Sequence, residues 1–128
     1  MMILLDTVTF LWIITGSKRL SQKAKEIYLD KKNKVYFSSV SFWEIIVKYA
    51  LGRLPLPSRP TEYIPKQRYI HGIETLPLEE GDVFELESLP RIHDDPFDRM
   101  LICQARARNL TILTPDKIIQ TYPVKTTW

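Results

Sequence analysis

A chain of 128 residues with 45% hydrophobic and 26% charged side chains has the size and composition of one folded domain, which excludes a disordered segment. The single cysteine, Cys103, excludes an internal disulfide, and the two histidines are too few to build a zinc site with it. The apolar run 8–14 is far shorter than the roughly 20 residues that cross a bilayer. We expect a single domain, residues 1–128, in the reducing cytoplasm and not in a membrane.

The net charge of +3 is distributed unevenly along the chain. Residues 17–34 carry seven basic side chains against two acidic ones, whereas residues 74–98 carry nine acidic side chains against one arginine. The acidic segment has the pattern of a solvated helix face. The basic segment could attract the phosphate backbone of a nucleic acid, although charge alone specifies no nucleotide sequence.

Short apolar and β-branched runs predict strands, and apolar residues spaced by three and four predict helices between them. The first run is apolar throughout, which favours a strand buried on both faces. In chain order we expect a strand at 2–5, helices at 7–14 and 20–31, a strand at 35–38, helices at 41–51 and 61–70, a strand at 73–76, helices at 79–89 and 96–109, a strand at 111–113, a helical turn at 116–120 and a strand at 124–126.

Capping and helix-breaking residues set the expected boundaries. Ser41 is the expected N-cap of the third helix, and Gly52 follows its end. Either Ser17 or Ser21 could cap the second helix, and Pro65 limits how far the fourth can extend toward its N-terminus. Strands that alternate with helices in this way predict an α/β fold with a parallel sheet covered on both faces, in which ligands bind at the carboxyl ends of the strands.

The segment from Asp94 to Arg99 places three carboxylates where an apolar helix begins. Asp95 is a good N-cap and Pro96 suits the first helical position, so Asp98 lies in the first turn. Asp98 shares a helix face with apolar residues, and a carboxylate there is costly to desolvate unless a cation or hydrogen-bond donors meet it. Alternatively, both acids are helix-start residues favoured by the helix dipole.

Three further carboxylates stand in similarly apolar surroundings. Asp6 ends the first strand, Glu44 is the only charge in the first half of the third helix, and Asp116 follows the fourth strand. Each could be a helix cap, and Glu44 a capping-box partner of Ser41. In a parallel sheet, however, these three and Asp98 fall along one edge, where they would repel one another unless cations neutralised them. Oxygen ligands favour Mg²⁺ or Mn²⁺, which can activate water to hydrolyse a phosphodiester.

The order of these features resembles that of PIN-domain ribonucleases, and within them the VapC-type toxins of bacterial toxin–antitoxin pairs. The stretches that carry the resemblance are 4–7 with Trp12, 40–45, 51–57, 93–99 with Ile102 and Ala105, and 113–116. The resemblance covers nearly the whole chain. It implies a three-layer α/β/α sandwich with a central mainly parallel sheet, a Mg²⁺-dependent (or Mn²⁺-dependent) endoribonuclease acting on a structured RNA such as tRNA or rRNA, a homodimer, and a cognate antitoxin protein that occludes the site.

The resemblance also implies roles for individual residues. The catalytic and metal-binding acids would be Asp6, Glu44, Asp98 and Asp116. Auxiliary roles would fall to Asp95 as a helix cap near a metal-bound water, and to Thr114, which would orient Asp116 or a water. Arg99 would contact either a phosphate or a neighbouring acid.

Two positions depart from the family pattern. Val8 stands where a polar residue is usual and Asp94 where arginine is common. Both changes leave open an alternative function, a non-catalytic PIN-like scaffold that binds a partner protein or RNA. His93 could touch phosphate, although a solvated loop position is the simpler expectation for it.

Overall fold

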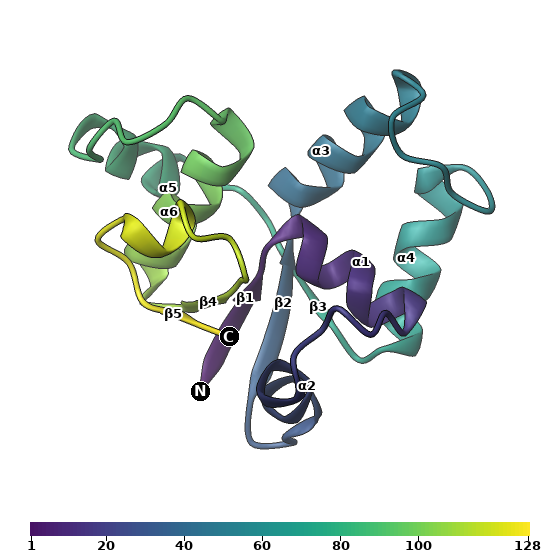
Figure 1. Ribbon diagram of the computed structural model, residues 1–128. Helices are drawn as coiled ribbons and strands as arrows, with labels where there is room; N and C mark the ends of the chain where they lie inside the picture. Colours follow the sequence, from purple (N-terminus) through teal and green to yellow (C-terminus); the bar gives the residue numbers. More distant parts are fainter.

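The computed structural model describes all 128 residues, and its centre is one sheet of five strands, all parallel, in the order β3-β2-β1-β4-β5 (Figure 1). The strands are β1 (Met2–Leu5), β2 (Lys34–Ser38), β3 (Glu74–Leu76), β4 (Thr111–Leu113) and β5 (Thr126–Thr127). The central strand β1 is buried from Ile3 to Leu5, as its continuous apolar sequence predicts. The parallel sheet expected from the sequence is confirmed.

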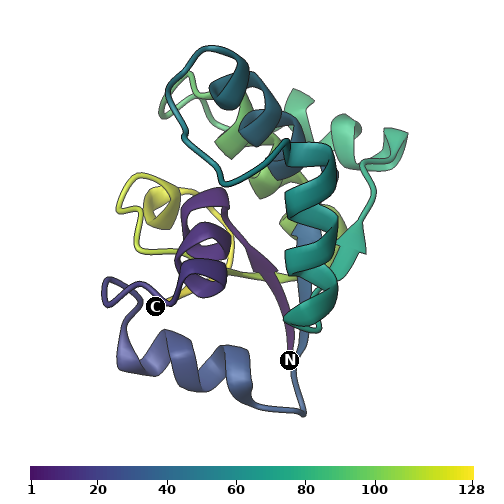
Figure 2. The same ribbon diagram turned by 90° about the vertical axis from the view of Figure 1, so that its right-hand side faces the viewer.

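Helices cover both faces of this sheet. They are α1 (Thr7–Thr15), α2 (Gln22–Leu29), α3 (Ser39–Ala50), α4 (Pro60–Ile70), α5 (Glu80–Phe84) and α6 (Pro96–Arg108), with short 3-10 turns at Glu85–Glu87 and Ile119–Thr121. Helices α5 and α6 lie on one side, and α1, α2 and α4 lie on the other (Figures 1 and 2). The predicted three-layer α/β/α arrangement is therefore confirmed. None of the helices is long and apolar enough to cross a bilayer.

The two faces of the sheet have separate hydrophobic cores because successive strand residues point in opposite directions. On one face, Leu4 packs with Leu101 and Ile102 of α6. On the other, Ile3 and Leu5 belong to the cluster formed with α1, α2 and α4. Helix α3 contributes to both clusters, because it follows β2 at the edge between the faces.

The start of α3 differs from the sequence expectation. Ser38, the last residue of β2, is the N-cap, and its side chain accepts a hydrogen bond from the Val40 backbone N–H. The helix therefore begins at Ser39 without an intervening loop, and Ser41 lies buried inside it. The prediction that Ser41 caps this helix with Glu44 as capping-box partner is wrong. Ser38 is both the end of β2 and the N-cap of α3, and the spacing of the serines in the sequence did not indicate this.

Other boundaries shift for local reasons. Helix α4 begins at Pro60 and has Pro65 in its interior, so the prediction that Pro65 limits how far this helix extends toward its N-terminus is wrong; Pro65 removes one N–H from the helical hydrogen bonds without ending the helix. Ser21, not Ser17, caps α2. The predicted helix 79–89 ends as a regular helix at Phe84 and continues as a 3-10 turn. The last strand forms at Thr126–Thr127, after the predicted 124–126, where Thr114 donates its N–H to the Thr127 carbonyl at 3.1 Å.

A buried ion pair fixes α5 against the end of α6. Arg108 donates from Nε to Asp82 Oδ1 and from Nη2 to Asp82 Oδ2, both at 3.0 Å. The Asp82 side chain is 4% exposed. Burial alone would raise the pKa of Asp82, but the hydrogen bonds from Arg108 and from the Glu79 backbone outweigh it and lower the pKa.

Replacing Asp82 with alanine should lower the free energy of unfolding at pH 7 by about 2–4 kcal/mol, because Arg108 and the Glu79 N–H lose their buried acceptor. The difference between wild type and variant should narrow as the pH falls below about 4, since protonation of Asp82 removes the same interaction from the wild type. Urea denaturation of wild type and variant between about pH 7 and about pH 3 measures this difference in unfolding free energy. Glu62→Ala, which breaks the exposed pair with Arg59, is the control and should leave stability unchanged.

Candidate metal centre

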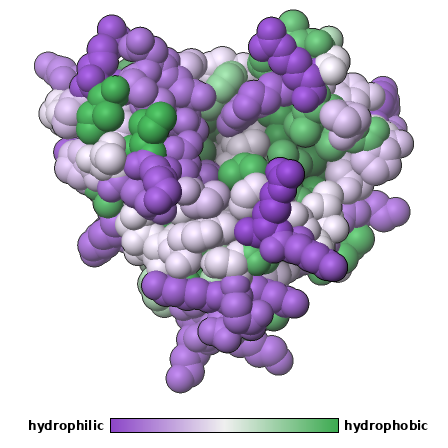
Figure 3. Space-filling view, in the orientation of Figure 1, coloured by the Kyte–Doolittle hydropathy of each residue, from purple (hydrophilic) through white to green (hydrophobic).

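The carboxyl ends of the strands carry an acidic pocket of about 190 Å³. This acidic pocket is lined by Asp6, Thr7, Val8, Glu44, Lys48, Asp95, Asp98 and Asp116. The structure thus brings together all four acids expected to bind metal, and Asp95 with them. The face of the molecule in Figure 3 is hydrophilic over most of its area and is hollowed between the part formed by α5 and α6 and the part formed by α3 and α4.

Asp6 is held at the junction of β1 and α1. Its Oδ1 accepts the Thr9 backbone N–H at 2.8 Å, so it is the N-cap of α1, and its Oδ2 accepts the Thr114 hydroxyl. Asp6 is 3% exposed. Burial raises its pKa, and the charge of Asp116 adds to this effect, while the bonds from Thr114 and Thr9 oppose it. The helix-cap alternative is correct and does not exclude a role in the pocket.

Thr114 connects two of the acids. Its hydroxyl donates to Asp6 and accepts the Asp116 backbone N–H at 3.0 Å. Asp116 in turn accepts the Ile118 N–H at Oδ1, at 2.8 Å, and its Oδ2 has no partner in the chain. Thr114 therefore fixes the Asp116 backbone relative to Asp6 from below the pocket, where it is fully buried.

Glu44 projects from α3 and is also buried. The Thr7 hydroxyl donates to its Oε1 at 2.6 Å and lies 2.9 Å from the Ser41 hydroxyl. The Lys48 ammonium pairs with its Oε2. Both carboxylate oxygens are thus engaged, one by the residue after Asp6 and the other by a lysine one turn further along the helix.

Asp98 is a second acid whose ionisation the pocket disfavours. Asp95 accepts the Phe97 and Asp98 backbone N–H groups at 2.9 and 3.0 Å and so caps α6 as predicted. Desolvation raises the pKa of Asp98 to about 6, and the charges of Asp95, Glu44 and Asp116 add to it against the bond from His93. Because the pKa of Asp98 is this close to neutral pH, a cation beside the carboxylate would favour its ionised form.

His93 and Arg99 occupy places that the sequence did not indicate. His93 is not a solvated loop residue, because its Nε2 lies 3.1 Å from Asp98 Oδ2 and its Nδ1 2.7 Å from the Tyr122 hydroxyl. Arg99 does not line the acidic pocket. It is buried, and its Nη1 donates to the Pro90 carbonyl at 2.8 Å and to the Tyr122 hydroxyl at 3.0 Å, so it meets neither a phosphate site nor an acid.

Several contacting residues were missed by sequence reasoning: Thr7, Ser41, Lys48 and Tyr122. A signal existed for Lys48, since it follows Glu44 by four residues on one helix face. For Tyr122 there was none, because it reaches His93 from 29 residues away. The substituted position Val8 lines the pocket, whereas Asp94 is 85% exposed and pairs with Arg91 outside it.

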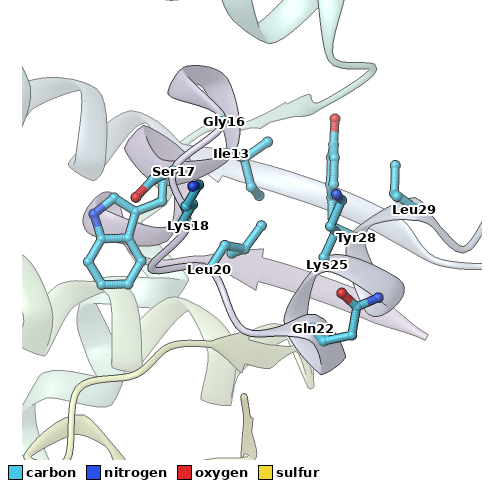
Figure 4. Close-up of a pocket in the computed structure, with 10 residues that line it drawn as sticks. Ile13, Gly16, Ser17, Lys18, Leu20, Gln22, Lys25, Tyr28 and Leu29 are labelled. Carbon is cyan, nitrogen blue, oxygen red and sulfur yellow. The ribbon is translucent and has the colours of Figure 1, made fainter.

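A larger cavity of about 340 Å³ lies between α1 and α2 (Figure 4). Ile13, Leu20 and Tyr28 give it an apolar lining, and Lys18 and Lys25 belong to it as well. It contains no carboxylate, so it offers a divalent cation none of the ligands found in the acidic pocket.

The donor set of the acidic pocket fits a hard divalent cation, because its ligand atoms are carboxylate oxygens that raise one another's proton affinity. No three of these side chains stand in metal-holding geometry. Donors within the chain direct the oxygens of Asp6 and Glu44, whereas Asp98 Oδ1 and Asp116 Oδ2 have no partner in the chain. Binding of a metal ion therefore requires some of these side chains to move. In the chain alone, Lys48 contacts Glu44 and His93 contacts Asp98.

The chain is similar to known proteins both in sequence and in structure. A ribonuclease VapC16 of Mycobacterium tuberculosis is 32% identical over 57 residues, which are 44% of this chain and 40% of that protein, so the match spans less than half of the relative's length. The fold is similar to a chain of VapBC2 from Rickettsia felis bound to a promoter DNA fragment, with a TM-score of 0.74 and 16% identity over 99% of this chain and 98% of that one.

A chain of the DNA-bound VapBC from Salmonella typhimurium is similar too, with a TM-score of 0.71 and 18% identity over 99% of this chain and 97% of that one. These structural likenesses confirm the fold. The family model of the PIN domain matches residues 3–125. The resemblance expected from the sequence is therefore confirmed, and the chain belongs to the PIN domain family.

Proposed function

We propose that this chain is a metal-dependent endoribonuclease of the VapC type, the toxin of a toxin–antitoxin pair. The observation that carries the proposal is the convergence of Asp6, Glu44, Asp98 and Asp116 in one pocket at the carboxyl edge of the sheet. Membership of the PIN domain family and similarity to a ribonuclease VapC16 support it. The raised pKa values of Asp6 and Asp98 further support a cation in the pocket, because burial, with a smaller contribution from neighbouring carboxylates, disfavours the ionised forms that a cation would stabilise.

Each acidic side chain has a proposed task. The four acids would hold Mg²⁺ or Mn²⁺, which when bound would lower the pKa of a water and offset the charge of the scissile phosphate. Asp95 and Thr114 position these acids, one by capping α6 below Asp98 and the other by bridging Asp6 and Asp116. We assign Arg99 no contact with substrate, because the Pro90 carbonyl and the Tyr122 hydroxyl hold its guanidinium in the protein interior.

The proposed substrate is a structured RNA such as tRNA or rRNA, and the proposed location is the cytoplasm. The proposed partner is a cognate antitoxin protein. The similar structures are VapBC assemblies, which supports a partner of that kind. A homodimer is also proposed. Exposed apolar side chains at α3 and α5, among them Trp43 on α3, Leu51 just after it and Phe84 at the end of α5, support contact with another protein surface.

The second candidate is a PIN-like scaffold that binds protein or RNA without cutting it. Two observations favour it: Val8 replaces a polar group within the acidic pocket, and no three acids stand in metal-holding geometry. The two candidates differ in one measurable property. A nuclease must bind Mn²⁺ at this pocket, whereas a scaffold need not, so titration of the wild-type chain with Mn²⁺ separates them.

Asp6→Asn and Asp98→Asn should each lower Mg²⁺-dependent RNA cleavage by roughly a thousandfold or more, because each removes a charged oxygen ligand from the cation. Circular dichroism should show an unchanged fold. Cleavage of a total tRNA and rRNA preparation, followed by sequencing of the RNA ends, is the measurement. Asp94→Asn, at an exposed position outside the pocket, is the matched control and should retain wild-type activity. Wild-type activity in Asp6→Asn or Asp98→Asn would contradict the assignment.

Asp98→Asn should also stabilise the metal-free protein. Since the folded-state pKa of Asp98 is raised to about 6, the wild type loses stability as the pH rises from about 4 through 6, where folding opposes ionisation. Allowing for the partial exposure of Asp98 and its bond to His93, the variant should gain about 1–2 kcal/mol at pH 7. Urea denaturation in EDTA at about pH 4.5 and about pH 7, on either side of that pKa, measures the difference in unfolding free energy between wild type and variant. An equal difference at both pH values would contradict it.

A further inference from the structure

Lys48 is the one basic residue that lines the acidic pocket. It stands a single turn after Glu44 on α3, and its ammonium pairs with Glu44 Oε2. The Glu44 side chain is 6% exposed and that of Lys48 is 46% exposed. Lys48 thus reaches from solvent into the pocket and places a positive charge on a buried acid.

This pair differs from an ordinary surface pair on a helix. Exposed pairs at this spacing contribute little to stability, because water screens both charges. Here the acid is buried among other acids, and Thr7 already holds its Oε1. Lys48 is therefore the positively charged partner of Glu44. Without it, Glu44 Oε2 would have no partner in the chain.

A divalent cation that used Glu44 would need the oxygen that Lys48 now occupies. Two cations at one carboxylate oxygen repel each other, so ion binding and the Lys48 pair exclude one another. Lysine has a flexible four-carbon stem, which lets its ammonium leave Glu44 without any change in the backbone of α3. Since the side chain is half exposed, the ammonium would then lie at the mouth of the pocket, within reach of a phosphate group of a bound substrate.

From this geometry we infer that Lys48 has two successive partners. It neutralises Glu44 while the pocket holds no divalent cation, and it contacts a phosphate of the RNA once a cation has taken over Glu44. The inference rests on the proposed nuclease function and adds to it a substrate-binding residue.

The test uses the full chain with Lys48→Met, which keeps the length and helix propensity of the side chain but removes its charge. Without RNA, the dissociation constant for Mn²⁺ measured by calorimetry should fall roughly three- to fivefold, because the internal competitor is gone. In RNA cleavage at saturating Mg²⁺, KM should rise roughly tenfold through loss of the phosphate contact, with kcat changed by less than about twofold.

Two further variants sharpen the result. Lys48→Arg keeps the charge and should return both the Mn²⁺ affinity and KM toward wild type. Lys66→Met removes an exposed lysine of α4 that lines no pocket, and it controls for the change in net charge, with both quantities expected to stay at wild-type values. Lys48→Gln gives the same two readouts if the methionine variant does not fold.

The outcomes separate the inference from the function on which it rests. Unchanged or weakened Mn²⁺ binding in Lys48→Met, beside a wild type that binds Mn²⁺, overturns the counterion role alone. A loss of kcat with unchanged KM overturns the phosphate contact. A wild-type chain that binds no Mn²⁺ overturns the nuclease proposal itself, and the inference with it.

Discussion

The burial of several carboxylates close together at one edge of a parallel sheet is the constraint on which the rest of this structure depends. Three of the four acids are reached by a side chain from another part of the chain. Thr114 after β4 reaches Asp6, Thr7 of α1 reaches Glu44, and His93 before α6 reaches Asp98, while Lys48 pairs with Glu44 from the same helix. These donors offset only part of the cost of ionisation: desolvation, with smaller contributions from Asp95, Glu44 and Asp116, still raises the pKa of Asp98 to about 6. The pocket is therefore electrostatically unfavourable and lowers the stability of the folded chain, as binding and catalytic sites commonly do.

The fold bears this cost because the helices that carry the acids are tied together beneath the pocket. Ser38 ends β2, caps α3 and donates its hydroxyl to Gln104 of α6, where both residues are fully buried. Gln104 also donates to the Pro77 carbonyl after β3 at 3.3 Å. The relative position of Glu44 and Asp98 is thus fixed by buried polar contacts in addition to apolar packing. Such contacts are demanding in geometry, since an unpaired buried group is costly.

The sequence predicted the fold and the gathering of acids for the same physical reason. Short apolar strands alternating with helices allow few arrangements, and in a parallel sheet the strand ends at Asp6 and Asp116 must share an edge. The merged strand end and cap at Ser38 was not predictable, because serine caps are local and several serines lie nearby. The contact of His93 with Tyr122 was not predictable either, since it joins a loop to a distant 3-10 turn through tertiary packing alone.

Arg99 shows how a charged residue beside the site can serve it from the interior. Its guanidinium holds the Tyr122 hydroxyl, and that hydroxyl lies against the His93 ring and accepts the His93 backbone N–H at 3.0 Å. His93 in turn contacts Asp98. A chain of polar contacts therefore runs from a buried cation to an acid of the pocket and fixes the orientation of the imidazole. Because Arg99 directly follows Asp98 on α6, the same helical turn presents the acid to the pocket and anchors, through the arginine, the residues that accompany it.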